Sequence, residues 1–192
     1  MKIGIDVSQL AFSKTGVAEY LSNLVEGILK LDKKNEYVLF FFSLRKEFPI
    51  KDYDFLKGNP KIQIKIFKIP PTILSLIWNR FHIAPIEWFV GDVDLYITSD
   101  WTEPPARKAK KATIIYDLII YKYPDETHNR AEFNIFGLKI SPNIVASQQR
   151  KLKWVKKESD LIFTISEASK RDIVELLGVD GSRVKVIYPG IV

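Results

Sequence analysis

The first thirty-one residues constrain the fold more than any other part of the chain. Residues 2–7, Lys-Ile-Gly-Ile-Asp-Val, have the length and apolar character of a short buried strand, and the polar residues 8–15 are predicted as a loop. A helix is predicted over Gly16–Leu31, because apolar residues recur there at three- and four-residue steps on one face: Val17, Leu21, Leu24, Ile28 and Leu31. A strand, a loop and a helix that begins at glycine form the first half of a βαβ unit. Sheets of this kind bind ligands beyond the carboxyl ends of their strands, so we expect the loop before Gly16 to belong to a binding site.

Strands and helices continue to alternate along the rest of the chain. Residues 36–42 form an uninterrupted apolar run, typical of a parallel strand buried on both faces, whereas residues 62–67 alternate and indicate a strand near an edge. Further strands are predicted over residues 94–97, 112–116, 161–165 and 184–188. Helices are predicted from a Thr72 cap, from Ser141-Pro142 to about Glu158, and from a Ser166 cap through Leu177 to Gly178, with a surface connection over residues 46–60. The pattern predicts an α/β fold with a doubly wound, mostly parallel, Rossmann-like sheet, and a length of 192 residues fits one domain over residues 1–192.

The most aromatic segment of the chain contains Trp78, Phe81, Trp88 and Phe89. We favour a helix packed on the sheet. The alternative is an amphipathic segment that touches a membrane or a lipid-linked substrate, although Arg80 is the only basic residue before the turn at Pro85.

Composition excludes several classes of site. The chain has no cysteine, which excludes disulfides, thiolate metal ligands and a cysteine nucleophile. Its two histidines, His82 and His128, are too few for a histidine-built metal cage, so we assign both to packing or to the surface and expect no metal.

Charge and hydropathy indicate the compartment and the partners. No segment approaches the roughly 20 uninterrupted apolar residues that span a bilayer, and the start at Met1-Lys2-Ile3 lacks the pattern of a signal peptide, so we expect a cytoplasmic location. The net charge of +6 favours anionic partners. Its local excess, six basic residues and no acidic one between Lys139 and Lys157, matches the dipole at the end of a predicted helix. Since the signatures of common RNA-binding modules are missing, no nucleic-acid partner is expected.

Polar residues follow the ends of several predicted strands. No G-x-x-x-x-G-K-[ST] loop, no G-x-G-x-x-G in the first turn and no G-x-S-x-G elbow is present. The residues at the strand ends are Ser8, Gln9 and Gly16; Ser99, Asp100 and Trp101; Asp117; and Ser166 and Glu167. Because parallel strands end at the same edge of a sheet, we expect these residues to line one cleft.

Four segments, in this order along the chain, carry a family resemblance. They are residues 2–6 with 15–24; residues 91–96 through Pro104-Pro105; Thr113-Ile114-Ile115-Tyr116-Asp117-Leu118 with Tyr123-Pro124-Asp125; and residues 159–169 with 186–190. Together they resemble the amino-terminal domain of family 4 (group 1) glycosyltransferases. In that family the third segment usually reads T-x-x-H-D-L, and the fourth contains V-S-E-x-S and V-x-P-x-G.

The resemblance implies a GT-B architecture, in which two Rossmann-like domains face each other across a cleft. This chain would be the acceptor-side domain, and the carboxy-terminal domain that binds most of the donor would be absent from it, so the chain alone is expected to be inactive. The implied reaction is retaining transfer of mannose or a related sugar from a nucleotide-sugar to a glycan or lipid-linked acceptor in polysaccharide or glycolipid assembly. No metal or other cofactor is implied, because backbone amides and basic side chains would stabilise the departing diphosphate. Peripheral contact with the inner face of the membrane belongs to the alternative interpretation of the aromatic segment.

The resemblance also assigns residue roles. Tyr116 and Asp117 are implied to be catalytic. Substrate-binding roles are implied for Ser8, Gln9, Gly16, Val17, Ser99, Asp100, Trp101, Ser166 and Glu167. Tyr116 stands where the family usually has histidine, and a phenol can hydrogen bond a sugar hydroxyl but is no near-neutral proton acceptor.

Each of these assignments has a structural alternative. Gly16 can simply begin the helix, Asp117 can bond its own backbone, and Ser166 and Glu167 can be the cap and first turn of a helix. The alternative function is a stand-alone Rossmann-like module that binds a phosphorylated small molecule and transfers nothing.

Overall fold

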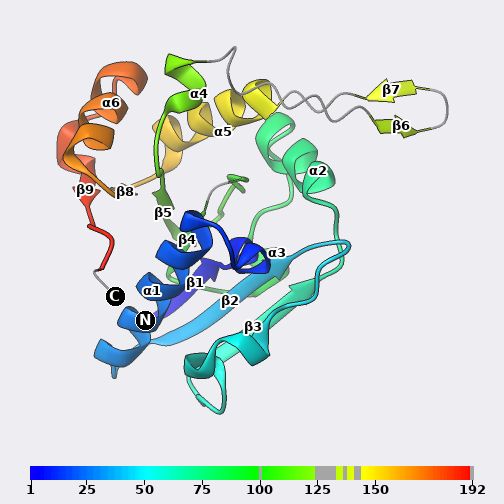
Figure 1. The fold of residues 1–192 in the computed structure, drawn as a ribbon, viewed down its shortest axis with the longest axis vertical. Helices are drawn as coiled ribbons and strands as arrows, with labels where there is room; N and C mark the ends of the chain where they lie inside the picture. Colours follow the sequence, from blue (N-terminus) through cyan, green and yellow to red (C-terminus); the bar gives the residue numbers. More distant parts are fainter. Residues whose placement is uncertain (100, 124–132, 136–137, 141–143, 191–192) are drawn as a thin grey trace.

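The core of the molecule is a sheet of seven parallel strands. The computed structural model describes residues 1–99, 101–123, 133–135, 138–140 and 144–190 (Figure 1). The strands lie in the order β3-β2-β1-β4-β5-β8-β9, and every neighbouring pair is parallel. Their bounds are β1 Lys2–Asp6, β2 Glu36–Phe42, β3 Ile62–Phe67, β4 Leu95–Thr98, β5 Lys110–Ile114, β8 Leu161–Thr164 and β9 Val184–Val186. The predicted doubly wound, Rossmann-like fold is confirmed.

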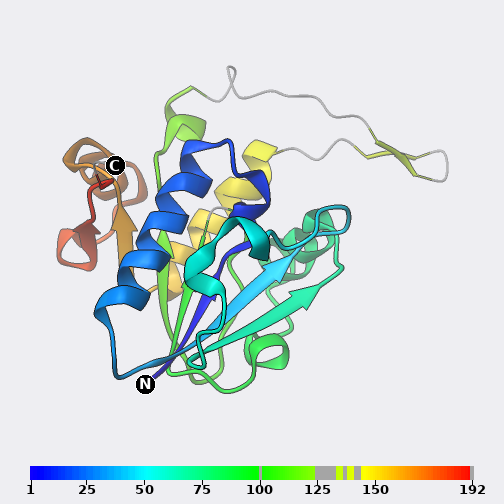
Figure 2. The same cartoon turned by 60° about the horizontal axis from the view of Figure 1, so that its bottom comes forward.

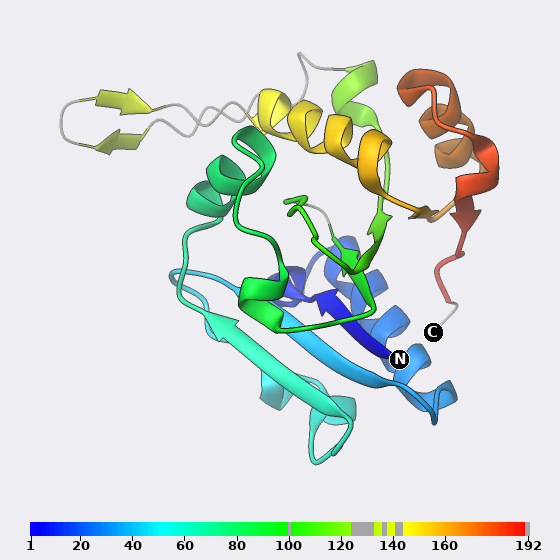
Figure 3. The ribbon, with the colours of Figure 1, turned by 180° about the vertical axis from the view of Figure 1, so that it is seen from behind.

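Helices cover both faces of this sheet, as the opposite views in Figures 1 and 3 show. One face packs against α1 (Gly16–Leu31) and the short 3-10 helices η1 (Ser8–Phe12) and η3 (Asp54–Leu56), and η2 (Ile50–Asp52) lies next to η3 with no buried residue. The other face packs against α2 (Pro71–Leu74) with its π-helical continuation η4 (Ser75–Arg80), α3 (Glu87–Val90), α5 (Ile144–Glu158) and α6 (Glu167–Leu177). Six of the seven residues of β2 are buried, alternately on the two faces, as its apolar run predicts.

Smaller elements complete the chain. They are α4 (Ile119–Lys122), η5 (Gly181–Arg183) and the antiparallel pair β6 (Phe133–Ile135) and β7 (Leu138–Ile140), which the sequence did not indicate. Figure 2 shows β6 and β7 as a hairpin that projects away from the sheet. Within the described residues, no helix is long and apolar enough to cross a membrane.

The buried face of α1 differs from the predicted one by part of a turn. The residues buried there are Ala18, Tyr20, Leu21, Ser22, Val25 and Leu29, whereas Val17, Leu24 and Ile28 are only partly buried. Leu31, which was predicted on the buried face, is 85% exposed. The prediction was wrong there because the buried stripe is centred on residues 18, 21, 25 and 29, which leaves the last residue of the helix outside the sheet.

Local chemistry explains the other shifts. Residues 8–12, predicted as loop, form η1, because the Ser8 amide and hydroxyl bond Asp6 Oδ1 at 2.9 and 2.6 Å and tighten the chain. The helix predicted from a Thr72 cap begins at Pro71, where proline's fixed φ suits the first turn. The connection over residues 46–60 was predicted to lie on the surface, but Phe48 and Leu56 are buried in the core. The predicted helix start at Ser141-Pro142 lies outside the described residues.

Candidate functional site

The strand order reverses between β1 and β4, and this switch point positions the candidate site. The chain leaves β1 toward β2 on one side, while β4 and β5 extend the sheet on the other. The loops that follow β1 and β4 therefore diverge, which is where ligands bind in open α/β sheets. The loops after β2, β1, β4 and β5 all reach this edge (Figure 2).

Tyr116 lies at this edge, just beyond the end of β5. Its ring is 8% exposed and meets the Tyr20 ring of α1 edge-on, with centroids 5.6 Å apart and planes at 87°. Its hydroxyl lies 3.5 Å from Ser99 Oγ, at the limit of a hydrogen bond, and its carbonyl accepts from Ser169 Oγ of α6 at 3.0 Å. The structure thus brings the predicted residues Tyr116 and Ser99 together.

Tyr20 is a member of this group that the sequence analysis did not single out. Its hydroxyl donates to the Ile187 carbonyl at 3.0 Å, beyond the end of β9. Burial raises the pKa of Tyr20, so the phenol remains protonated at neutral pH. The sequence feature that could have identified Tyr20 is its position in the second turn of a helix that follows a strand-end loop.

Ser8 and Gln9 are buried beneath this edge, at 2% and 5% exposure. The Ser8 hydroxyl donates to Asp6 Oδ1 and accepts from the Phe42 amide at 3.0 Å. Ser8 therefore fixes the end of β1 against the end of β2.

The start of α1 is open to solvent. Thr15 caps the helix by accepting from the Ala18 amide at 3.3 Å. Gly16 is exposed, and a Cβ added to it would meet no atom within 4 Å. Neither packing nor a positive φ requires glycine at this position, and nothing in the described structure blocks the approach of a ligand. Val17 is partly buried against the core.

A second aromatic pair bridges the switch point. The ring of Trp101, in the loop after β4, meets the ring of Phe12, in the loop after β1, with centroids 5.3 Å apart and planes at 69°. Lys46, in the loop after β2, places its Nζ 4.9 Å from the centre of the Phe12 ring. The sequence analysis did not single out Phe12 or Lys46, although both follow predicted strand ends. Asp100, a predicted site residue, lies outside the described residues.

Buried side chains hold the backbone on both sides of Trp101. The Lys151 ammonium donates to the Ser99 carbonyl at 2.7 Å, and Asn79 Nδ2 donates to the Trp101 carbonyl at 2.9 Å. The other end of the same amide, Asn79 Oδ1, accepts from the Glu103 amide at 2.9 Å. Lys151 and Asn79 are 2% and 1% exposed, so these bonds are shielded from water.

Glu103 anchors the far end of this loop inside the molecule. Its carboxylate is fully buried, 2.9 Å from Lys111 Nζ and 2.7 Å from Thr98 Oγ1. Lys111 Nζ also lies 3.1 Å from Glu158 Oε2, which His82 Nε2 approaches to 2.9 Å. No periodic pattern marks Glu103 or Lys111, and the sequence therefore did not indicate that they pair.

Glu158 and His82 close this network at the end of α5. Burial acts to raise the pKa of Glu158, but the His82 hydrogen bond and the Lys111 charge outweigh it and lower the pKa. The His82 ring stacks on Trp154 with centroids 3.6 Å apart and planes at 6°, which confirms the prediction that His82 serves packing. His128 lies outside the described residues.

The remaining predicted residues make local contacts. Asp117 Oδ1 accepts from the Ile119 amide at 3.1 Å, and Ser166 Oγ caps α6 by accepting from the Ser169 amide at 3.0 Å. Glu167 is exposed in the first turn of α6. These are the contacts that the structural alternatives predicted for Asp117 and for the start of α6.

No three His, Asp or Glu side chains come together as a set of metal ligands within the part of the chain that the structure describes.

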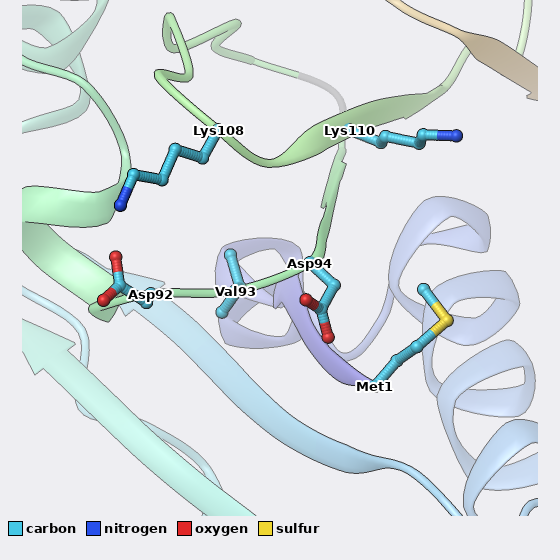
Figure 4. Close-up of a pocket in the computed structure, with 6 residues that line it drawn as sticks. All are labelled: Met1, Asp92, Val93, Asp94, Lys108 and Lys110. Carbon is cyan, nitrogen blue, oxygen red and sulfur yellow. The ribbon is translucent and has the colours of Figure 1, made fainter.

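An open hollow of about 750 Å³ lies at the opposite edge, where β1, β4 and β5 begin (Figure 4). It is lined by Met1, Asp92, Val93, Asp94, Lys108 and Lys110. In Figure 4 the side chains of Asp92 and Lys108 point toward one another. None of the predicted site residues lines this hollow, and the sheet's ligand-binding edge is the other one, so we assign it no function.

The chain resembles known proteins in fold. No protein-family model matches the chain, and no curated protein matches it. A UDP-glucosyltransferase from Polygonum tinctorium capable of glucosylating indoxyl, in complex with 3,4-dichloroaniline, matches with a TM-score of 0.50 and 12% identity, over 99% of this chain and 52% of that chain. Phytolacca americana UGT2, complexed with UDP-2-fluoro-glucose and pterostilbene, matches with a TM-score of 0.47 and 12% identity over the same shares. A short-chain dehydrogenase from Oenococcus oeni matches with a TM-score of 0.37 and 10% identity, over 98% of this chain and 96% of that one.

The chain therefore spans about half the length of the glucosyltransferases it matches. It has the fold of one half of a GT-B glycosyltransferase, a seven-stranded parallel Rossmann-like domain.

Proposed function

We propose that this chain is the amino-terminal, acceptor-binding domain of a retaining glycosyltransferase, which moves mannose or a related sugar from a nucleotide-sugar to a glycan or lipid-linked acceptor. The observation that carries the proposal is the fold of half a GT-B enzyme combined with a switch point at which Tyr116 contacts Tyr20 and approaches Ser99. The matched Polygonum tinctorium enzyme is named a UDP-glucosyltransferase, which supports a nucleotide-sugar as donor.

In this proposal the acceptor lies over the carboxyl edge of the sheet. The Tyr116 phenol, which Ser99 Oγ approaches to 3.5 Å, hydrogen bonds one of its sugar hydroxyls, and the exposed Asp117 accepts from another. The acceptor hydroxyl oxygen forms a bond to the anomeric carbon as the bond to the nucleotide diphosphate breaks, and the hydroxyl proton passes to an oxygen of the departing diphosphate. The amides at the start of α1, beside Gly16, approach the acceptor sugar closely and stabilise the negative charge of that leaving group.

A lipid-linked acceptor and peripheral membrane contact remain part of the proposal. The aromatic segment is divided between core and surface: Trp78 is fully buried, whereas Phe81 is 57% exposed. Ile73 and Leu76 on α2 and η4, with Ile83 beyond them, are also large exposed apolar side chains. These residues support contact with an apolar chain or a bilayer surface.

Calorimetric titration of the 192-residue chain tests the proposal. The ligands are UDP, GDP, UDP-glucose, GDP-mannose, a panel of glycans and lipid-linked sugars, each with the parent chain and with Gly16→Val. Gly27→Val is the matched control, because Gly27 lies in the same helix and a Cβ there also meets no atom within 4 Å. We expect glycan or lipid-sugar binding that Gly16→Val weakens and Gly27→Val leaves unchanged, with weak nucleotide binding.

The alternative function has a distinct outcome in the same titration. The open start of a 16-residue helix is also suited to a phosphate group. Tight binding of nucleotides or phosphates, without glycan binding, would contradict the acceptor-side assignment and support a stand-alone phosphate-binding module.

A further inference from the structure

We propose that Phe12, Lys46 and Trp101 form a subsite for a sugar that carries an anionic group, a phosphate or a carboxylate. The inference rests on the proposed function and names the acceptor class for that site. It adds Phe12 and Lys46 to the residues that the sequence indicated.

Three adjacent strands contribute one residue each to this subsite. The strands are β2, β1 and β4, whose following loops carry Lys46, Phe12 and Trp101. The Phe12 and Trp101 rings are partly exposed and contact each other at 5.3 Å across the switch point. Aromatic rings offer an apolar surface for the C–H groups of a sugar ring, and Trp adds an N–H donor for a hydroxyl.

Lys46 supplies the selectivity for negative charge. Its side chain is exposed, its Nζ lies 4.9 Å from the Phe12 ring centre, and no salt bridge to it is found in the part of the chain that the structure describes. The Lys46 amide donates to Ser43 Oγ at 2.9 Å, which fixes the turn from which the side chain extends. An ammonium on a flexible stem can leave the ring and pair with a phosphate or carboxylate.

The buried network explains how Trp101 is held for this role. Asn79 bonds the backbone at Trp101 and at Glu103, and Lys151 bonds it at Ser99. Burying the Glu103 and Lys111 charges carries a desolvation cost, so a buried pair of this kind need not make the folded protein more stable. We infer that the pair serves to hold the loop that contains Trp101 in one conformation. A loop already fixed before binding loses little entropy when the sugar arrives.

The chain offers a matched control pair. Trp88 is exposed, and Arg107 lies 5.2 Å from the centre of its ring, which repeats the combination of an aromatic face and a cation. Trp88 belongs to α3, just before β4 begins, so this pair lies at the amino edge of the sheet. If exposed ring–cation pairs bound anionic sugars indiscriminately, this second pair would bind them as well.

Nuclear magnetic resonance of the ¹⁵N-labelled chain tests the subsite. The chain has four tryptophans, and Trp101→Phe assigns the indole N–H signal of Trp101. The probes are glucose 1-phosphate, methyl glucuronide, methyl glucoside and inorganic phosphate. We expect the two anionic sugars to shift the Trp101 indole signal and to leave the Trp88 signal in place.

Affinities of the variants, measured by calorimetry, complete the test. Lys46→Ala, at an exposed position that the fold does not require, should weaken both anionic sugars about five- to tenfold and methyl glucoside less than about twofold. Trp101→Ala should weaken all three sugars about tenfold. Trp88→Ala and Arg107→Ala should change nothing.

The inference can be overturned with or without the proposed function, and the measurements distinguish the two cases. Sugar binding that shifts Tyr116 but not Trp101, or that is indifferent to Lys46→Ala, would refute the subsite and leave the proposed function standing. Binding of inorganic phosphate as tightly as glucose 1-phosphate, with no binding of methyl glucuronide or methyl glucoside, would refute the proposed function and the subsite together.

Discussion

Tyr116 is held by three different elements, and this limits the chemistry it can perform. The Tyr20 ring of α1 packs on it, Ser99 approaches its hydroxyl, and Ser169 of α6 bonds its carbonyl. A phenol can donate or accept a hydrogen bond, but it does not take up a proton near neutral pH. In a glycosyltransferase this residue would orient an acceptor hydroxyl without removing its proton.

Gly16 gives a prediction at the same scale. At Gly16 no atom lies within 4 Å of an added Cβ, and the backbone φ is not positive. Gly16→Ala should therefore raise the free energy of unfolding by about 0.4–1 kcal/mol, because alanine lowers the conformational entropy of the unfolded chain. Urea denaturation measures the change. A destabilised Gly16→Ala variant would mean that glycine serves the fold at this position.

Glu158 predicts a pH dependence of stability. Its pKa is lowered in the folded protein, so its contribution is complete above the ordinary value of 4.5 and is lost as the pH falls through the folded value. Stability should therefore decline with falling pH in the acid range, and Glu158→Gln should make that decline shallower. Denaturation between pH 3 and 7, with the exposed Glu47→Gln as control, measures it; parallel curves for parent and Glu158→Gln would contradict the assignment.

Among the elements, β5 provides Lys111, whose buried ion pair with Glu103 holds the loop before this strand. Lys111→Met leaves the Glu103 carboxylate buried without its cation and should cost about 3–5 kcal/mol of stability. The double variant Lys111→Met with Glu103→Gln should recover most of this loss, because the amide keeps a partner for Thr98 and carries no charge. Thermal and urea denaturation measure both variants, and a loss below about 1 kcal/mol for Lys111→Met would refute the role of the pair.

β1 is held close to β4 by a glycine. A Cβ at Gly4 would lie 2.6 Å from Cδ2 of Tyr96, whose side chain is 1% exposed and has no room to move. Gly4→Ala should therefore destabilise the protein by about 1–3 kcal/mol. Gly27→Ala in α1, where a Cβ meets no atom within 4 Å, should instead stabilise it by about 0.5–1 kcal/mol. Equal effects of the two substitutions in urea denaturation would contradict this packing.

The predictability of these elements follows from the range of their interactions. The seven strands and α1 are marked by local apolar patterns, which hydrophobic burial enforces directly, and each was predicted within a few residues. The contact of Phe12 with Trp101 depends on how strands 80 or more residues apart are ordered in the sheet. The pairing of Glu103 with Lys111 depends on the path of the loop between them. Leu31 was misplaced because an apolar residue at the end of a helix follows the period whether or not the sheet extends beneath it.

On the scale of the whole molecule, the two edges of the sheet offer contrasting surfaces. The carboxyl edge carries the aromatic and hydroxyl groups at the switch point, whereas the amino edge carries the open hollow with its mixed charges. The fold of half a GT-B glycosyltransferase leads us to expect binding at the first of these. The two edges lie at opposite ends of the strands, so one map of bound ligand can distinguish them.

The most direct test is to record backbone amide signals of the ¹⁵N-labelled chain during titration with acceptor glycans, GDP-mannose and UDP-glucose. We predict that glycans shift the signals of Gly16, Ser99, Trp101, Tyr116 and Ser169, and that nucleotide-sugars cause smaller changes confined to the start of α1. Shifts at Asp92, Asp94, Lys108 and Lys110, with none at the switch point, would contradict the assignment of the carboxyl edge as the acceptor site.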